Sequence, residues 1–263
     1  MKIALCASEA VPFAKTGGLA DVCGALPLEL EGLGQEAIMV MPKYQSVRPS
    51  GALIKRLDED FDVTTIGENT RVYFLKHDMY LRAGLYGDDF GDYPDNLKRF
   101  SYFCSKTLEL FSKIDFKPDI MHCNDWQTSL IPMFVKIYRD RYFPKSPKLP
   151  KSLLTIHNVS YQGLFPREAM PETGLGWEHF SLLGLEFYDK LNLLKGGIQY
   201  SDIVNTVSVT HAREVQTKEF GYGMEGVLSA KKDRFFGITN GIDYKVWNPQ
   251  GDPNIFKNYS SDN

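Results

Sequence analysis

The sequence predicts an α/β fold, a Rossmann-like doubly wound parallel sheet. Three observations lead to this prediction. Short apolar runs alternate with stretches of helical periodicity along most of the 263 residues. Apolar residues make up 43% and charged residues 24% of the chain, as in an ordinary globular domain. Polar clusters follow several of the apolar runs directly, where the carboxyl ends of parallel strands would lie.

The first part of the chain reads as a strand–loop–helix–strand unit. Residues 2–8 (KIALCAS) form a short apolar run that is typical of a buried strand. A loop follows, and residues 19–33 show helical periodicity despite Pro27. Residues 36–41 (EAIMVM) read as the next buried strand, which Pro42 closes. Such a unit begins a parallel sheet.

The remainder of the chain continues this alternation. Residues 53–78 read as strands and turns, and beyond Asn248 the chain is polar without periodicity. Between them we expect strands at 118–123, 152–156, 203–207 and 235–239, and helices at 95–113, 126–140, 177–186, 189–200 and 208–219.

Charge, cysteine usage and hydropathy exclude several classes of protein. The net charge of −3 does not suit a binder of the nucleic-acid backbone. The four cysteines have irregular spacing, which argues against a disulfide framework or zinc site and favours reduced thiols. The N-terminal apolar run is too short for a signal peptide, and no stretch approaches the ~20 apolar residues of a membrane span. We therefore expect a cytoplasmic protein without nucleic-acid or membrane partners.

Four polar clusters follow predicted strands, at residues 9–18, 122–126, 157–163 and 240–243. In a doubly wound sheet, ligands bind in the crevice at the carboxyl ends of the strands. Because all four clusters fall at such ends, we expect their side chains to meet in one site.

The loop before the first helix has features of a phosphate site. Gly17 and Gly18 would let a ligand approach the backbone closely, and a helix N-terminus offers free N–H groups and a positive dipole end. Lys15 adds a positive charge. The pattern is neither a dinucleotide fingerprint nor a P-loop. Alternatively, the glycines serve only a tight strand-to-helix turn.

Two further clusters have a structural and a functional interpretation. Asp125 follows a predicted strand and opens a predicted helix, so it is either an N-cap or a residue of the site. His157 ends the next strand and is either a structural hydrogen-bonding residue or a site residue. His122 with Asp125 would be a weak metal pair, and Trp126 suits the core equally well.

Four segments resemble motifs of the glycogen and starch synthases, in the order in which that family has them. The resemblance runs from residue 2 to about residue 250. The segments are Lys15–Val22 (KTGGLADV, preceded by Ser8-Glu9), His122–Trp126, Thr155–Asn158, and Ile238–Asp243 with the Trp247-Asn248-Pro249 that follows.

The resemblance implies a GT-B architecture, in which two Rossmann-like domains face each other across a cleft. Residues 1–250 would form the N-terminal, acceptor-side domain and residues 251–263 the start of the linker, with the C-terminal donor domain absent. It further implies transfer of glucose from ADP-glucose to the non-reducing end of an α-1,4-glucan such as glycogen, with retention and without a cofactor. By itself, this half is expected to have little or no activity.

The resemblance also implies roles for individual residues. His157 and Asp125 would belong to the catalytic site, and Tyr86 and Asn158 to the acceptor side of the cleft. Residues that would bind the donor ADP-glucose are Lys15, Gly17, Gly18, Asp21 and Asn240.

Two other functions remain open at this stage. One is a non-catalytic maltooligosaccharide-binding module derived from such an enzyme. The other is a GT-B transferase that uses a UDP-linked sugar or makes sucrose-type products. Asp60 and Asp62 form the Asp-x-Asp pattern of metal-dependent transferases of a different fold, but they lie far from the strand-end clusters and are interpreted as a solvated turn. We expect no metal site.

Overall fold

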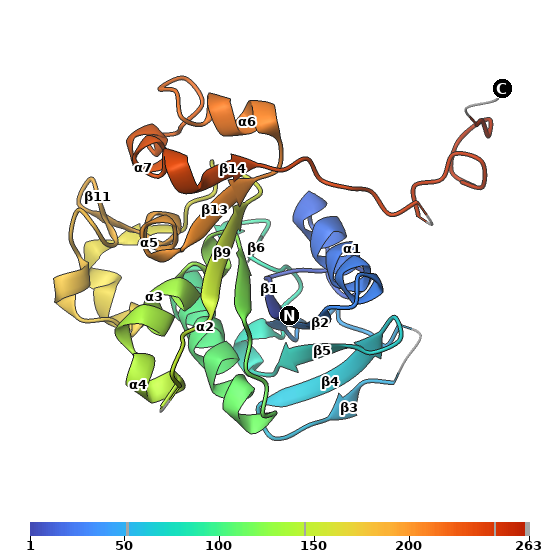
Figure 1. The fold of residues 1–263 in the computed structure, drawn as a ribbon, viewed down its shortest axis with the longest axis horizontal. Helices are drawn as coiled ribbons and strands as arrows, with labels where there is room; N and C mark the ends of the chain where they lie inside the picture. The colour runs from blue at the N-terminus through green and yellow to red at the C-terminus, as the bar shows by residue number, and fades with distance from the viewer. Residues whose placement is uncertain (51–52, 145, 245, 261–263) are drawn as a thin grey trace.

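In a computed structural model that describes all residues except 51–52, 145, 245 and 261–263, the chain forms a nine-stranded sheet with helices on both faces (Figure 1). The strand order is β14-β13-β9-β8-β1-β2-β5-β4-β3. The strands from β14 to β5 run parallel, and β4 and β3 extend one edge antiparallel. Their bounds are β1 Lys2–Cys6, β2 Glu36–Pro42, β3 Lys55–Arg56, β4 Phe61–Ile66, β5 Thr70–Leu75, β8 Ile120–Asn124, β9 Lys151–Ile156, β13 Ile203–Thr206 and β14 Phe235–Gly237.

The direction of winding changes between β1 and β8. From β1 the chain adds β2 on one side, and it later returns to add β8, β9, β13 and β14 on the other. Such a topological switch point leaves a crevice at the carboxyl ends of the two central strands. The predicted doubly wound parallel sheet is therefore confirmed, and its topology places the expected ligand site.

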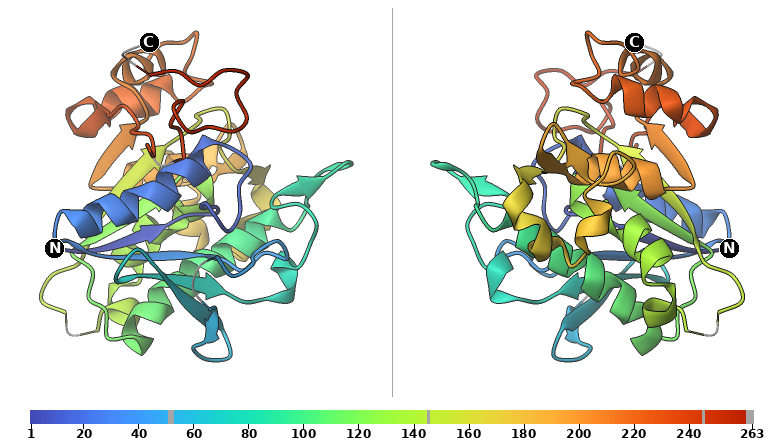
Figure 2. Two further views of the ribbon diagram at one scale, coloured as in Figure 1. Left: turned by 90° about the vertical axis from the view of Figure 1, so that its right-hand side faces the viewer. Right: turned by 90° about the vertical axis from the view of Figure 1, so that its left-hand side faces the viewer.

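Helices cover both faces of this sheet. Figure 2 shows α1 on one face and α2 with α3 on the other, where α3 also packs against α5. The α-helices are α1 Gly18–Gly32, α2 Asn96–Lys113, α3 Leu130–Ile137, α4 Arg139–Tyr142, α5 Leu193–Tyr200, α6 Val209–Glu214 and α7 Glu225–Ala230.

Two small sheets lie outside the main one. One pairs β6 Gly87–Asp88 with β7 Gly91–Asp92, and the other contains β10 Leu164–Pro166, β12 Lys190–Asn192 and β11 Glu186–Phe187 in that spatial order. Short 3₁₀ turns connect several of the elements.

The predicted helix at 126–140 is interrupted in the structure. It starts as a 3₁₀ turn, Trp126–Thr128, continues as α3, and breaks at Tyr138 before the short α4. The break follows from the backbone of Tyr138, whose φ of −108° and ψ of 40° lie outside the helical region.

The predicted helix at 177–186 is wrong. Only a 3₁₀ turn, Trp177–His179, forms there, and the chain then turns into β11. The reason is the buried ammonium group of Lys195, whose Nζ donates to the carbonyls of Leu182 (2.7 Å), Gly184 (3.0 Å) and Glu186 (2.7 Å). Carbonyls that converge on one cation cannot all point along a helix axis.

The remaining differences concern the ends of elements. The predicted helix at 189–200 starts only at Leu193, because β12 precedes it and the Asn192 side chain caps its first turn (Lys195 N to Oδ1, 2.9 Å). The predicted helix at 208–219 ends at Glu214. Neither helix α7 nor the small sheet of β10 to β12 was predicted from the sequence.

Beyond β14 the described chain has no regular element and extends away from the sheet (Figure 1). The proposed domain boundary at residue 250 thus stays a prediction. All four cysteines are buried and not disulfide-bonded. No helix in the described part of the chain has the length and apolar character to cross a membrane.

Candidate active site

A cleft of about 700 Å³ lies at the carboxyl ends of β1, β8, β9 and β13, at the topological switch point. Another hollow, of about 540 Å³, lies over β3 to β5, where no strand-end cluster contributes. The cleft is therefore the candidate site. Its lining residues are Glu9, Thr16, Gly17, Gly18, Leu19, Tyr86, Asp92, Asn96, Asp125, Trp126, Gln127, His157, Asn158, Tyr161, Val207 and Asn240.

The glycine pair faces this cleft at the N-terminus of α1. Gly17 is the N-cap residue, with an extended backbone (φ −153°), and no side chain caps it within the described part of the chain. A Cβ built on Gly17 or Gly18 would meet no described protein atom within 4 Å. Since neither glycine has the positive φ that a tight turn would demand, the turn does not require glycine. The open space and the uncapped N–H groups are instead suited to a bound anion.

Lys15 and Asp21 lie beside the cleft and are not among its lining residues. The Lys15 ammonium pairs with Asp21 Oδ1 at 2.7 Å, and both side chains are about one-third to one-half exposed. Lys15 Nζ also lies 5.7 Å from the centre of the Trp247 ring. This pairing holds a positive charge next to the glycine pair, while leaving it free to exchange partners at modest cost.

Glu9 is a cleft residue that the sequence did not single out. It is 4% exposed, and its carboxylate accepts hydrogen bonds from the Thr16 amide and hydroxyl and from Tyr86 Oη (3.2 Å). Tyr86 Oη also bonds Ser8 Oγ at 2.7 Å. Glu9 therefore ties the glycine-containing loop to β1 and to Tyr86. Its place directly after the first strand was the signal that could have identified it.

Asp125 does not cap a helix, so the N-cap interpretation is wrong. Its backbone has a positive φ (+56°), and its carboxylate accepts the backbone N–H of His157 at 2.7 Å. Burial raises the pKa of Asp125 to about 7, against the effect of hydrogen bonds from the amides of His157 and Asn158. Asp125 thus joins the ends of β8 and β9 across the cleft.

His157 is fixed in one orientation. Its Nε2 lies 2.9 Å from Asn124 Oδ1, and Asn124 Nδ2 donates to the Cys6 carbonyl at 3.1 Å. The amide oxygen must then accept, so His157 carries its proton on Nε2. Burial, with a smaller effect of His122, lowers the pKa of His157 to about 4. The ring is therefore neutral at pH 7, and its buried Nδ1 has no hydrogen-bond partner in the described structure.

Three further residues complete the cleft. Asn158 and Asn240 are exposed and line it. Trp126 is both core and cleft floor: it is 8% exposed and packs edge-on against Phe100, with ring centres 5.1 Å apart. Gly163 is required beside it, because a Cβ there would lie 2.5 Å from Trp126 Cε3.

The interpretation of Asp60 and Asp62 as a solvated turn is wrong, although both lie away from the cleft. Asp62 is 7% exposed and pairs with Lys43 and Lys76, and Asp60 pairs with Lys106. Within the described residues, no group of three or more histidine, cysteine or acidic side chains is arranged to hold a metal ion.

This fold and cleft place the chain in the class of doubly wound α/β domains whose ligands bind at a switch point, with a helix N-terminus available for an anion. A family model described as starch synthase catalytic domain matches residues 2–230. The chain belongs to this family.

Curated relatives are named glycogen synthase. Those of Geotalea daltonii and Syntrophotalea carbinolica are each 44% identical to this chain and cover 99% and 100% of it. The chain spans about half, 56%, of the length of either relative.

Solved structures agree with this assignment. The catalytic domain of starch synthase IV from Arabidopsis thaliana, bound to ADP and acarbose, superposes with a TM-score of 0.82 at 31% identity, over 99% of this chain and 55% of that one. The fold is that of the N-terminal domain of a GT-B glycosyltransferase. A sucrose-phosphate synthase from Thermosynechococcus elongatus shares the fold at 16% identity and a TM-score of 0.53.

Proposed function

We propose that the chain is the N-terminal, acceptor-side half of a glycogen (starch) synthase, which transfers glucose from ADP-glucose to the non-reducing end of an α-1,4-glucan with retention. The observation that carries this proposal is the open glycine pair at the N-terminus of α1, which faces the same cleft as Asp125 and His157. The relatives' names and the ADP and acarbose of the starch synthase IV structure support it.

The charges of the cleft suit departure of a nucleoside diphosphate. The N–H groups of α1 at Gly17 and Gly18, with the ammonium of Lys15 beside them, would stabilise the negative charge that develops on the leaving phosphate. Asp21 would hold Lys15 until the donor arrives, and Asn240 would contact the donor from the opposite wall. No cofactor is needed for this chemistry.

The acceptor side would be organised by Asp125, His157, Asn158 and Tyr86. Asp125 already binds the His157 backbone, and Glu9 is bound to Thr16 and Tyr86, so neither carboxylate is placed as a free covalent nucleophile. A front-face transfer, assisted by the donor phosphate itself, therefore suits this cleft better than a glycosyl-enzyme intermediate.

This half by itself would transfer glucose poorly or not at all. Closure of two domains excludes water and brings further cations to the diphosphate, and a single domain cannot close. We place the complete enzyme in the cytoplasm, in glycogen biosynthesis.

The decisive test is a transfer assay on the full-length protein. With ADP-glucose and maltotriose it should release ADP and lengthen the acceptor, and UDP-glucose should be a poorer donor. Binding of maltooligosaccharides without any nucleotide-dependent transfer would favour the alternative, a non-catalytic glucan-binding module. Preference for UDP-glucose would favour a different GT-B transferase.

A matched pair of glycine variants tests the phosphate site. Gly18→Ala would place a methyl group in the open space before α1 and should raise the KM for ADP-glucose by about 10- to 100-fold, without loss of stability. Gly32→Ala, which also meets no described atom but lies at the other end of α1, should leave the KM unchanged. Equal KM values for the two variants would refute the phosphate site.

A further inference from the structure

The hollow over β3, β4 and β5, away from the cleft, is lined by charge of one sign. Its volume of about 540 Å³ is in the range of small-molecule sites. The described residues that line it include three cations, Lys55, Arg71 and Lys113, and no acidic side chain. Because the chain as a whole has a net charge of −3, this positive lining does not follow from the overall composition.

The register of the strands brings these residues onto one face of the sheet. Lys55 of β3 lies opposite Val63 of β4, which in turn lies opposite Tyr73 of β5. Residues directly opposite each other in antiparallel strands share a face, and so does Arg71, two positions before Tyr73 in the same strand. Lys113, the last residue of α2, completes the positive rim.

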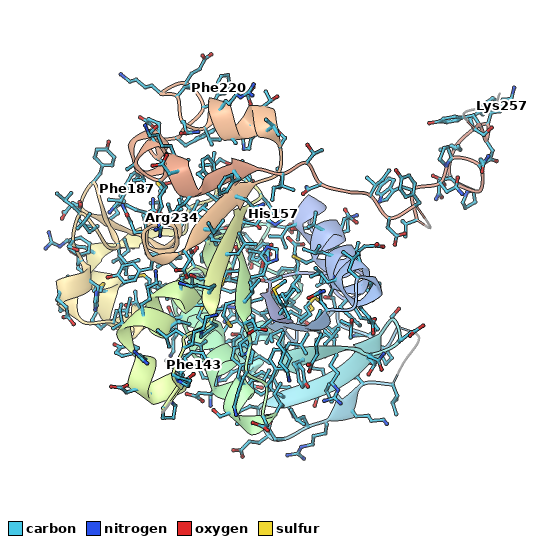
Figure 3. The ribbon with its side chains drawn as sticks, in the orientation of Figure 1. Phe143, His157, Phe187, Phe220, Arg234 and Lys257 are labelled. Carbon is cyan, nitrogen blue, oxygen red and sulfur yellow. The ribbon has the colours of Figure 1, made fainter. Side chains whose placement is uncertain are left out.

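The hollow lies far from the cleft. Asn96 at the start of α2 lines the cleft, whereas Lys113 at its end lines the hollow. The 18 residues of this helix place about 27 Å between the two regions. Figure 3 shows His157 well separated from the sheet edge that β3 and β4 form. A ligand in the hollow therefore cannot contact the reacting groups of the cleft.

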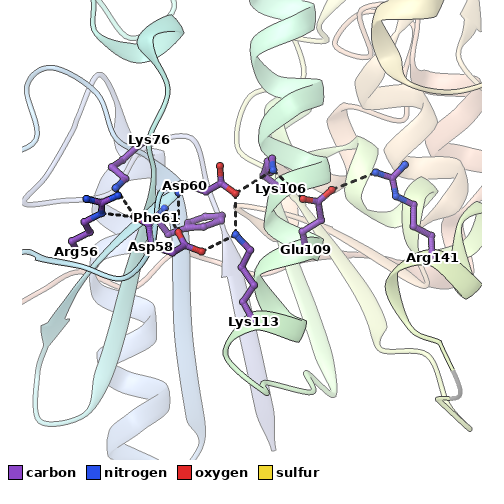
Figure 4. Close-up of polar contacts among 9 residues, drawn as sticks. All are labelled: Arg56, Asp58, Asp60, Phe61, Lys76, Lys106, Glu109, Lys113 and Arg141. Carbon is purple, nitrogen blue, oxygen red and sulfur yellow. Dashed lines mark hydrogen bonds and ion pairs between the residues drawn. The ribbon is translucent and has the colours of Figure 1, made fainter.

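The three cations differ in how far they are neutralised. Lys113 points toward Asp58 and Asp60, at 2.7 and 2.9 Å (Figure 4). The side chains of Lys55 and Arg71 are exposed and have no ion-pair partner among the described residues. A concave surface lined by one sign of charge concentrates the electric field and attracts counterions. Two positive charges thus remain available for an anion.

Apolar surface lies between these two charges. The Tyr73 ring is buried, Val63 and Ile114 are partly buried, and Leu57 is 40% exposed. A phosphate monoester has about two negative charges at pH 7 and three strong acceptor oxygens, which the planar fork of an arginine binds in a bidentate manner. The hollow therefore matches a dianionic phosphate group that is attached to a small organic group.

We propose that this hollow is a second anion site, which binds a small phosphate monoester through Lys55 and Arg71, with the organic group of the ligand against Val63 and Tyr73. The limited volume and the converging charges favour such a small molecule over an acidic protein segment. The proposal does not depend on the proposed function, because it uses no residue of the cleft.

The test is a calorimetric titration of the 263-residue chain with phenyl phosphate, a dianion with an apolar ring. Lys55→Gln and Arg71→Gln should each weaken binding by about three- to tenfold, and together by about 10- to 100-fold. Both side chains are exposed and unpaired, so neither variant should lose stability in thermal unfolding. Inorganic phosphate should bind about tenfold more weakly than phenyl phosphate, and phenol should not bind.

Two controls locate the binding. Lys218→Gln removes the same charge from an exposed position beyond α6 and should bind phenyl phosphate like the wild type. Gly18→Ala alters the glycine pair of the cleft and should also leave this affinity unchanged. An unchanged affinity in the double variant Lys55→Gln/Arg71→Gln would overturn the proposal. Loss of binding in Gly18→Ala would do the same, because it would place the phosphate in the cleft.

The pH dependence and a direct map of the contacts provide a second readout. The affinity for phenyl phosphate should fall below about pH 6, where the phosphate takes up a proton, whereas that for benzenesulfonate should not change. In NMR spectra, phenyl phosphate should shift the amide signals of Val63 and Tyr73 and leave that of His157 in place. Shifts confined to the cleft, or equal affinities for phenyl phosphate and inorganic phosphate, would contradict the assigned site.

Discussion

The two ends of helix α2 lie in regions that shift the protonation of ionisable side chains in opposite directions. Its first residue, Asn96, lines the cleft, and its last, Lys113, belongs to an ion-pair network (Figure 4). With 18 residues the helix separates these regions by about 27 Å. In the cleft, burial moves ionisable groups toward their neutral forms, whereas in the network, pairing moves them toward their charged forms.

The network connects the turn before β4 with α2 and α4. Lys113 lies 2.7 Å from Asp58 and 2.9 Å from Asp60, and Lys106 continues the chain of contacts to Glu109 and Arg141. Burial by itself would raise the pKa of Asp58, but the hydrogen bonds from Lys113 and the nearby backbone outweigh it and lower this pKa. The same pairing raises the pKa of Lys113 against the effect of burial.

At the cleft, no ion pair offsets the effect of burial on the pKa values of Asp125, His122 and His157 within the described residues. Asp125 has a raised pKa, and burial lowers the pKa of both His122 and His157 to about 4. None of the three has an ion-pair partner in the described structure. The network therefore stabilises charged side chains, whereas burial at the cleft keeps ionisable groups close to their neutral forms, and such shifted groups are concentrated at functional sites.

The largest expected effect concerns Asp125. Its pKa is about 7 in the folded chain, against an ordinary value of 3.8, so the folded state binds this proton more tightly than the unfolded state. The resulting stabilisation is complete below pH 3.8 and is lost as the pH rises through 7, at about 1.4 kcal/mol per unit. We therefore expect Asp125→Asn to become progressively more stable than the wild type over this range, as measured by urea unfolding.

Comparison with the network sharpens this experiment. His122 and His157 are present in both proteins, so their contributions to the pH dependence cancel in the difference. Asp58 has a lowered pKa, so its stabilisation is present above pH 3.8 and is lost only as the pH falls below it. Asp58→Asn should therefore show a constant difference from the wild type between pH 5 and 7. If the difference in unfolding free energy between Asp125→Asn and the wild type were also constant over this pH range, the proposed contrast between the cleft and the network would be wrong.

Gly163→Ala is expected to have the next largest effect. Its φ of +63° and the 2.5 Å approach of a Cβ to Trp126 predict a loss of about 2–4 kcal/mol in the free energy of unfolding. Thermal unfolding and tryptophan fluorescence would measure this loss and the displacement of the cleft floor. Gly32→Ala is the control and should change stability by less than about 1 kcal/mol. Wild-type stability of Gly163→Ala would show that the floor is adaptable.

Tyr86→Phe should cost less, about 1–2 kcal/mol, because the buried Ser8 hydroxyl and the Glu9 carboxylate each lose a partner. Chemical denaturation would measure it. Tyr142→Phe, which loses one bond to Ser105 near the network, should cost about 0.5 kcal/mol. If Tyr142→Phe lost more stability than Tyr86→Phe, the hydrogen bonds of Tyr86 at the cleft would not be the stronger contribution to folding.

Lys113→Met should have the smallest effect. This lysine is about one-third exposed, so water and salt screen its two ion pairs, and we expect a loss of at most about 1 kcal/mol. The loss should shrink in about 1 M salt, whereas that of Tyr86→Phe should not. A large, salt-independent loss would mean that the network acts through packing of the lysine stem.

Much of the fold was predictable because periodicity is a local property. The apolar runs at 2–8 and 36–41 became parallel strands, and 95–113 became α2 almost residue for residue. The helix expected at 177–186 does not form, because Lys195 of a later helix binds backbone carbonyls in this segment. The local hydrophobic periodicity of the segment cannot indicate such a distant contact.

The sequence by itself determined the alternation of strands and helices, the position of the glycine pair before the first helix, and the polar clusters at strand ends. Each of these depends on neighbours within a few residues. The tertiary structure alone decided that Asp125 binds the His157 amide rather than a helix end, that Glu9 supports the glycine loop, and that Asp62 is paired rather than solvated. These outcomes depend on partners distant in sequence and on burial, which exist only once the parallel strands align.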